Sequence, residues 1–375
     1  MSTLKPRAVY AEIDLDAIQR NLRRVKAMAG GRAVCAVVKA DAYGHGALPV
    51  SKALVAAGAD MLAVAIPEEA LELREAGIDA PILVLGHTDP SNAGIAIEYR
   101  ITHTVYDRPL AVALSDAALR AGKTASVHVK IDTGMNRLGL RPSDSGSYAR
   151  FLGGLPGLRV EGIYSHFADA DVPGSPFARE QFARFREALD AFRREGVDPG
   201  IRHIASSGAV LEFPEAYMDM VRTGILLYGL SPSGARESPE GFTPAMRLHA
   251  GITLLKTVPA GESVSYGRTY RTSRESRIAT LPIGYADGYS RALSNRAFAS
   301  LHGKRVPVVG RVCMDQCMLD VTDVPEAREG DEVLLFGGPA MPVGEIAGLL
   351  GTIDYEVVCM VKKRVPRVYP GRSEG

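Results

Sequence analysis

The sequence has little net charge, few cysteines and no long apolar run, and each of these absences narrows the possible functions. Its net charge is +1, which indicates neither a nucleic-acid partner nor an anionic membrane surface. Four cysteines in 375 residues are too few for a disulfide framework, so we expect reduced, mostly buried thiols in a cytoplasmic protein. No segment is apolar enough to span a bilayer, and the charged residues 1–16 are unlike a signal peptide.

Predicted strands and helices alternate over about the first 230 residues, after a first helix that Asp14 can cap. Such alternation favours a parallel sheet, and about eight strands fit a (β/α)8 barrel. A doubly wound open sheet is the alternative, although no glycine-rich dinucleotide motif follows the first strand. The expected strands are 33–38, 61–65, 81–85, 101–105, 125–131, 158–165, 201–205 and 217–221.

A second, mainly β domain is expected after residues 231–244, where proline, glycine, serine and charge concentrate. Residues 302–304 form a plausible hairpin turn, and Val9–Ile13 alternates like a strand that pairs with this domain. We therefore predict a barrel over 14–235 and a discontinuous domain over 1–13 and 236–375. Its expected elements are strands at 247–258, 263–266, 277–284, 306–309, 311–321, 332–336 and 357–364, and a helix at 343–350.

Lys39 ends the first barrel strand, and Gly44 and Gly46 predict a loop after it. An amine at the end of a buried strand is costly unless it is paired or used, and partial desolvation lowers its pKa. A Schiff-base lysine fits this position. Spacing alone favours the alternative, a lysine that reaches solvent, because most lysines are solvated.

Polar residues collect where the predicted strands end, and in a barrel those ends share the face that carries the chemistry. Arg222–Ile225, with Ser207 from the preceding loop, suits an anion because glycine lets backbone N–H groups approach phosphate oxygens. A lysine and a phosphate site on one rim indicate pyridoxal phosphate (PLP), although a sugar-phosphate enzyme fits the same spacing. The residues are Lys39, Tyr43, Lys130, Asp132, Arg137, His166, His203, Ser206, Ser207, Arg222, Gly224 and Ile225.

The motifs resemble those of the PLP-dependent alanine racemases over nearly the whole chain. AVVKADAYGHG at 36–46 is similar to the family's cofactor-lysine motif and is the most specific match. The second-domain matches are SYGRTY at 265–270, GYADGY at 284–289, RVCMDQ at 311–316 and IDYE at 353–356. A barrel followed by a β domain is the architecture of this family, in agreement with the strand count.

The resemblance implies a two-base racemisation. Lys39 would hold PLP as a Schiff base and then act as the base on one face of the α-carbon, with Tyr266 as the base on the other face. One side chain in a closed site readily reaches only one face. In the family this tyrosine comes from the other subunit, so a head-to-tail homodimer is implied.

The resemblance also implies roles for the remaining site residues, with no metal ion among the ligands. Arg222 would face the pyridine nitrogen without giving it a proton, which weakens the electron sink and limits side reactions such as transamination. His166 would pack against the ring, and His203 would lie behind Arg222. The implied phosphate ligands are Tyr43, Ser207, Gly224, Ile225 and Tyr355. The implied substrate contacts are Arg137 and the Met314 backbone, with Tyr285 and Asp315 along the path into the site.

Lys130 and Ser206 are two further positions for which the sequence makes a specific prediction. Lys130 alternates with apolar neighbours and therefore points to the polar side, near Arg137. Two cations there repel unless an anion intervenes, and many family members carbamylate this lysine; a plain pair with a carboxylate is the alternative. Ser206 stands where the family usually has asparagine, which would loosen local phosphate contacts.

The resemblance implies conversion of L-alanine to D-alanine for the bacterial cell wall. Tyr285, Met314 and Tyr355 would crowd the pocket toward a methyl side chain, although a broader racemase acting on serine also fits. A barrel-type basic-amino-acid decarboxylase is less favoured because its second-domain motifs differ. A non-catalytic PLP-binding protein built as a lone barrel is disfavoured by the β domain that carries Tyr266.

Overall fold

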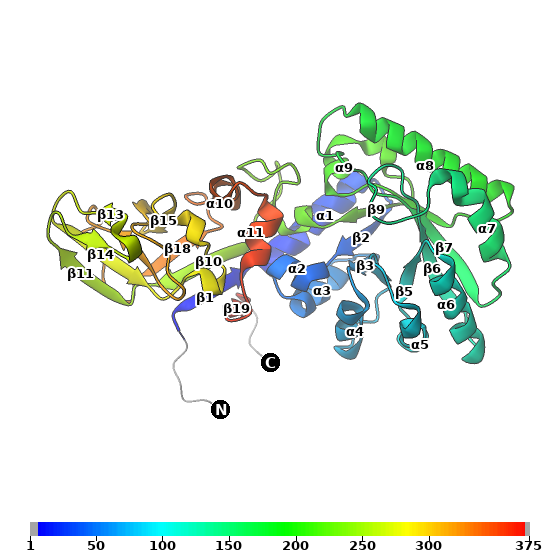
Figure 1. The fold of residues 1–375 in the computed structure, drawn as a ribbon, viewed down its shortest axis with the longest axis horizontal. Helices are drawn as coiled ribbons and strands as arrows, with labels where there is room; N and C mark the ends of the chain where they lie inside the picture. The colour runs from blue at the N-terminus through cyan, green and yellow to red at the C-terminus, as the bar shows by residue number, and fades with distance from the viewer. Residues whose placement is uncertain (1–6, 372–375) are drawn as a thin grey trace. The chain divides into compact units, whose positions relative to one another are not determined.

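The computed structural model describes residues 7–371, which divide into two compact units. Of the described residues, one unit contains 19–42 and 47–227, and the other contains 7–18, 43–46 and 228–371. Figure 1 labels the elements of both. Within residues 7–371, no helix combines the length and apolar character needed to cross a membrane.

The first unit is a nearly closed barrel, which confirms the predicted fold class. Within the described residues its sheet has eight parallel strands in the order β8-β7-β6-β5-β4-β3-β2-β9. Parallel pairing makes all carboxyl ends meet at one face. The strands are β2 (Ala33–Val37), β3 (Met61–Val64), β4 (Ile82–Val84), β5 (Thr102–Val105), β6 (Ala125–Lys130), β7 (Leu158–Tyr164), β8 (Ile201–His203) and β9 (Met220–Thr223).

Helices follow the strands and cover the outside of the sheet (Figure 1). The longest, α8, begins after Ser175, whose hydroxyl accepts from Ala178 N at 3.1 Å, and it buries Phe185, Leu189 and Phe192 on one stripe. The helices are α1 (Leu15–Ala29), α3 (Ala47–Ala56), α4 (Pro67–Glu75), α5 (Ala93–Glu98), α6 (Arg108–Arg120), α7 (Ser145–Gly153), α8 (Pro176–Arg194) and α9 (Ser207–Glu212).

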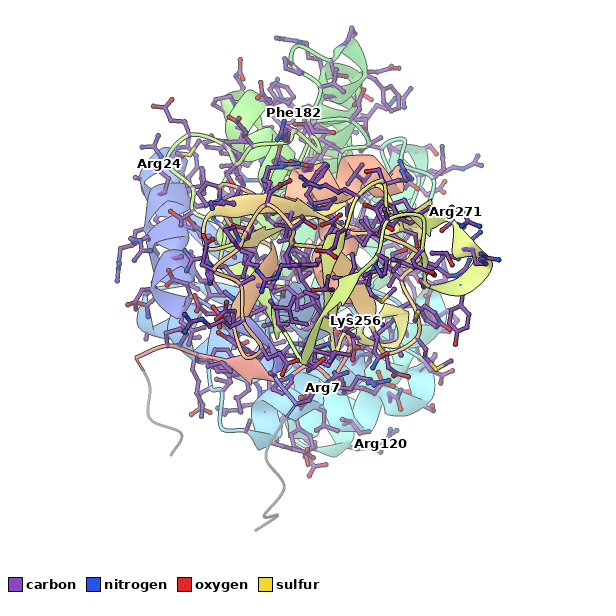
Figure 2. All side chains as sticks on the ribbon, turned by 90° about the vertical axis from the view of Figure 1, so that its left-hand side faces the viewer. Arg7, Arg24, Arg120, Phe182, Lys256 and Arg271 are labelled. Carbon is purple, nitrogen blue, oxygen red and sulfur yellow. The ribbon has the colours of Figure 1, made fainter. Side chains whose placement is uncertain are left out.

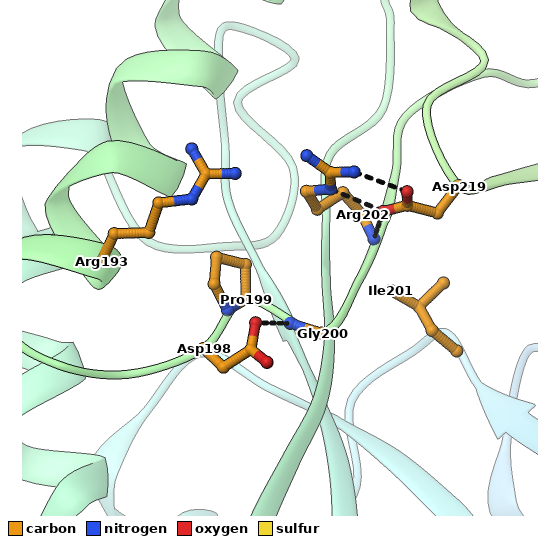
Figure 3. A pocket seen from close by; sticks show the side chains of 7 residues that line it. All are labelled: Arg193, Asp198, Pro199, Gly200, Ile201, Arg202 and Asp219. Carbon is orange, nitrogen blue, oxygen red and sulfur yellow. Dashed lines mark hydrogen bonds and ion pairs between the residues drawn. The ribbon is translucent and has the colours of Figure 1, made fainter.

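The strands β8 and β9, which stand at the two ends of the sheet order, are joined by individual hydrogen bonds. Arg222 N donates to Ala205 O at 2.9 Å, and Asp219 N donates to Arg202 O at 3.1 Å. The Arg202 guanidinium also makes a bidentate pair with Asp219, at 2.6 Å for each contact (Figure 3). The depression that Figure 3 shows lies at the amino-terminal end of these strands, and we assign it to barrel closure.

The chain leaves β2 in an unusual backbone conformation. Where we expected a loop, α2 (Lys39–Gly44) forms a single left-handed turn, with φ between 52° and 54° at the four residues 40–43 and 78° at Gly44. Such φ values cost L-residues about 1–2 kcal/mol each, except glycine. Strain of this kind persists only where surrounding contacts enforce it.

The second unit is built of short sheets. Within the described residues, the largest runs β16-β15-β18-β10-β1-β19, so Val9–Ile13 pairs with later strands as expected. A second sheet runs β11-β14-β17, and β12 pairs with β13. The strands are β1 (Val9–Ile13), β10 (Met246–Gly251), β11 (Leu254–Val258), β12 (Ser263–Val264), β13 (Tyr270–Arg271), β14 (Ser276–Leu281), β15 (Phe298–Leu301), β16 (Lys304–Pro307), β17 (Cys317–Asp320), β18 (Glu332–Phe336) and β19 (Arg367–Val368). The helices are α10 (Val343–Leu350) and α11 (Asp354–Met360).

Three expectations for this unit need correction. The strand predicted at 357–364 is wrong, because α11 occupies its first half; the buried residues Asp354, Val357, Val358 and Val361 follow helical spacing. The strand predicted at 247–258 is two strands in different sheets, and the one predicted at 311–321 is a strand only at Cys317–Asp320. The strands β13, β15 and β19 were missed. The hairpin at 302–304 is confirmed between β15 and β16. Of the four cysteines, Cys35 and Cys317 are buried and Cys359 is exposed.

Candidate active site

Arg222 on β9 is 4% exposed and lies at the carboxyl end of the barrel. Its Nη1 lies 2.8 Å from His203 Nδ1, and its Nη2 lies 3.1 Å from His166 Nδ1. Nη2 also donates to Ser165 O at 2.7 Å and Ile204 O at 3.3 Å. Every one of these acceptors is uncharged, so the hydrogen bonds orient the guanidinium without neutralising it.

These contacts fix the tautomers of a buried chain of two histidines. A guanidinium can only donate, so His203 Nδ1 accepts and Nε2 carries the proton, which it donates to His128 Nδ1 at 2.8 Å. His128 Nε2 then carries a proton and has no hydrogen-bond partner among the described residues. Burial and then Arg222 lower the pKa of His128 to about 3 and that of His203 well below its usual value. Both rings are therefore neutral at physiological pH.

Tyr164, at the end of β7, supports this cluster from one side. Its ring stacks on His203 with centroids 4.9 Å apart and planes at 5°. Arg222 Cζ lies 5.0 Å and Lys130 Nζ 5.4 Å from the centroid of the same ring. The hydroxyl makes a 2.8 Å hydrogen bond with Thr104 Oγ1. The ring is thus fixed and offers its π-face to two cations.

Lys130 is buried at the end of β6, with 6% of its surface exposed, and its Nζ donates to Ile131 O at 2.9 Å. Burial and then Arg222 lower its pKa to about 7, against a smaller opposing effect of Asp132. The Asp132 carboxylate accepts three backbone N–H groups from the loop 134–137, at 3.0–3.1 Å. Asp132 therefore shapes the loop that presents Arg137.

His166 shows that the predicted barrel residues share one electrostatic environment. Burial and then Arg222 and Lys130 lower its pKa well below the usual value. Arg137 and Lys39 lower it further. The structure thus brings Lys39, Lys130, Arg137, His166, His203 and Arg222 together. This excess of positive charge fits an anionic cofactor such as PLP better than a neutral ligand.

Ser207 and Gly224 meet beside this cluster. Ser207 Oγ accepts from Gly224 N at 3.0 Å, at the start of α9, and Ile225 begins the next short helical segment, η4 (Ile225–Tyr228). Next to Gly224, Thr223 Oγ1 is buried with no hydrogen-bond partner among the described residues. Ser206 precedes α9, and no cap bond from its side chain is found. Backbone N–H groups at a helix start suit phosphate, so these residues fit that group.

Tyr43 and Tyr355 lie together in the second unit. Their ring centroids are 6.0 Å apart, and Tyr43 also packs on Tyr228 at 4.9 Å. Tyr43 is buried, and burial raises the pKa of its phenol, so the hydroxyl stays protonated. A protonated phenol can donate to an anion, as expected of a phosphate ligand.

Tyr266 is 71% exposed on the surface of the second unit, in η5 (Tyr266–Arg268). It lines a concave surface with Met314, which is 53% exposed, and Asp315. Tyr285 is joined to this segment because its N donates to Cys313 O at 3.0 Å. Exposed charges of the same unit, including Lys256 on β11 and Arg271 on β13, are labelled in Figure 2. The second-unit residues expected from the sequence thus form two groups, one around Tyr43 and one around Tyr266.

The sequence reasoning missed two site residues. The side chains of His128 and Tyr164 point into the barrel. Both residues lie within strands, and strand alternation alone does not identify a residue as part of a site. Only the register of β6, β7 and β8 shows that they support His203 and Arg222.

Comparison with known proteins identifies the family. The model described as "Alanine racemase, N-terminal domain" matches residues 13–232, and that described as "Alanine racemase, C-terminal domain" matches residues 245–369. The chain belongs to the alanine racemase family. Within this family it is 52% identical to the alanine racemase of Desulfovibrio desulfuricans over 97% of this chain and 98% of that one. The alanine racemase of Desulforamulus reducens is 49% identical over 97% and 99%.

Solved structures of the family have the same fold. The alanine racemase of a D-cycloserine-producing Streptomyces lavendulae superposes with a TM-score of 0.93 at 42% identity, covering 99% of each chain. That of Bacillus anthracis, solved with bound L-Ala-P, gives a TM-score of 0.90 at 39% identity, covering 98% of this chain and 96% of that one. Family membership and fold are therefore consistent over the whole barrel and the β domain.

Proposed function

We propose that this protein is a PLP-dependent alanine racemase that converts L-alanine to D-alanine, which would supply peptidoglycan synthesis. The observation that carries the proposal is the match of both family domains over nearly the whole chain, to relatives named alanine racemase. The cationic cluster around Arg222 and Lys39 supports it independently, since it suits an anionic cofactor beside a reactive amine.

The cofactor would be held by the residues that the resemblance to this family implies. Lys39 would bind it covalently, and Arg222 would face its ring nitrogen with a positive charge that no bonded carboxylate offsets. His166 would contact the ring, positioned by Arg222 Nη2. The phosphate would be bound by Ser207, Gly224, Ile225, Tyr43 and Tyr355. When bound, PLP draws electrons from the α-carbon of the amino acid and makes its proton acidic.

Two side chains would then move the proton. Lys39 Nζ would exchange it on one face of the α-carbon, and Tyr266 Oη on the opposite face, so that a proton leaves one side and another arrives on the other. Arg137 and the backbone of Met314 would hold the carboxylate, while Tyr285 and Asp315 would line the approach. The Asp132 contacts that fix the 134–137 loop support the role of Arg137.

A homodimer with shared sites follows from this assignment. The 71% exposure of Tyr266 and its place on a concave surface, beside the exposed Met314, support its insertion into the partner's barrel. Large apolar and aromatic groups exposed together are typical of an interface.

The decisive experiment measures D-alanine after the purified protein is incubated with PLP and L-alanine. Because enantiomers have equal free energy, we expect the reaction to end at equal amounts of the two. L-Serine, assayed in parallel, measures the breadth of specificity. Release of carbon dioxide from a basic amino acid, or no D-alanine at any enzyme concentration, would contradict the proposal.

We further propose that Lys130 carries a carbamate. Its pKa of about 7 makes the amine largely neutral above that pH, so Nζ can attack carbon dioxide, forming an N–C bond and releasing a proton. The product would be an anion, which the two cations that lower this pKa, Arg222 and Arg137, would stabilise.

Carbon-13 bicarbonate should therefore give a carbamate resonance in the wild-type protein that weakens as the pH falls below about 7 and is missing from the Lys130→Ala variant. An unmodified Lys130 amine at about pH 8, where most of the amine would be neutral, would disprove the modification.

A further inference from the structure

The left-handed turn after Lys39 needs an external restraint. Residues 40–43 hold φ near 53° without glycine, at a cost of about 1–2 kcal/mol each. The chain closes the turn with its own hydrogen bonds, among them one from Ala42 N to Val38 O at 2.9 Å. A backbone hydrogen bond contributes about 1 kcal/mol, which does not exceed the strain at one such residue. Contacts from outside the turn must therefore help to maintain it.

Glu69 supplies such a contact from another segment. It lies in the first turn of α4, and its Oε1 accepts from Ala40 N at 2.6 Å. Its other oxygen, Oε2, accepts from Ala65 N at 2.7 Å, just past the end of β3. One carboxylate thus ties the carboxyl ends of β2 and β3 together. Its place at the start of a helix also stabilises its negative charge.

The Ala40 N–H belongs to the peptide that follows Lys39, which gives this bond its importance. The preceding peptide is held at Val38 O by Ala42 N, and Val38 N donates to Ala63 O at 2.8 Å. Both peptide planes that flank Lys39 are therefore fixed, one by the turn itself and the other by Glu69. Since these planes set the direction of the Cα–Cβ bond, Glu69 controls where the Lys39 side chain starts.

We propose that Glu69 is a positioning residue that holds the left-handed turn and thereby aims Lys39. The proposal rests on the proposed function, because it assigns the reactive amine to Lys39. Glu69 itself touches neither substrate nor cofactor. A residue that merely capped α4 would affect stability, whereas this residue affects the turn and the chemical step.

The test compares Glu69→Ala and the milder Glu69→Gln with Glu68→Ala, which removes an exposed carboxylate from the same helical turn. We expect Glu69→Ala to lower kcat about 10- to 100-fold with little change in KM, as small misplacements of reacting groups do. Glu69→Gln keeps an oxygen for one of the two N–H groups and should lose less. Glu68→Ala should match the wild type.

Amide hydrogen exchange provides a readout independent of activity. Exchange at Ala40 and Ala42 should accelerate in Glu69→Ala and stay unchanged in Glu68→Ala, at equal melting temperature or after correction for it. Unchanged exchange, or faster exchange with an unchanged kcat, would overturn the proposal. If the wild type makes no D-alanine, the proposed function fails, while the exchange rates still report whether Glu69 holds the turn.

Discussion

Replacing Lys39 with alanine is expected to abolish racemisation in both directions, with a loss on the order of 10,000-fold or more. The variant loses the amine that would bind PLP covalently and the base on one face of the α-carbon. The visible absorption band of the bound cofactor should disappear as well. Activity is measured as D-alanine formed from L-alanine, and the band by spectroscopy of the protein after free PLP is removed.

Lys52→Ala is the matched control, because Lys52 is an exposed lysine on the nearby helix α3. It should retain both the band and the activity. If Lys39→Ala kept the band, the covalent assignment would be wrong, and another amine would have to hold the cofactor. Lys130, the buried amine with the lowered pKa, is the first alternative to examine.

Replacing Tyr266 with phenylalanine should lower racemisation about 100- to 10,000-fold, the usual contribution of a general acid–base group. The loss should be unequal between the two enantiomers. Exchange of the α-proton with deuterated solvent needs only the base on the same face as that proton. One enantiomer should therefore keep most of its exchange through Lys39, while the other loses it.

Tyr270→Phe is the control for this variant. Tyr270 lies on β13 of the same unit and donates to Asp320 Oδ2 at 3.0 Å, so its loss tests a structural hydroxyl nearby. It should leave the ratio of the two exchange rates unchanged. Equal losses for both enantiomers in Tyr266→Phe would argue against two bases on opposite faces.

The barrel could be predicted from sequence because its strands and helices follow local sequence patterns, such as helix caps. Asp14 accepts from Ala17 N at 2.7 Å and caps α1 as expected, and Pro67 opens α4. The β domain was harder, since its short strands change sheets without a break in hydrophobicity, as at β10 and β11. The error at α11 has a similar origin, because a run of valine and cysteine favours a strand by composition.

The candidate site residues could be predicted where they follow a strand, but not where their proposed role acts through another residue. Lys39, His166, His203 and Arg222 stand at strand ends or just after them, which a barrel turns toward one face. Glu69 looked like an ordinary acidic residue in the first turn of a helix. Its contact with Ala40 depends on the left-handed turn. The sequence gives no sign of this turn, because residues 40–43 include no glycine.

Because β2 pairs with β9, we expect the proposed active site to form late in folding. Cys35 on β2 lies in register with Arg222 on β9, so the strand that leads to Lys39 adjoins the one that carries the guanidinium. Nearly the whole barrel sequence separates these two strands, and bringing such distant segments together is entropically expensive and slow. We therefore expect a nascent or truncated chain that lacks β9 to have no competent pocket for the proposed cofactor, so cofactor binding would show that the whole barrel has formed.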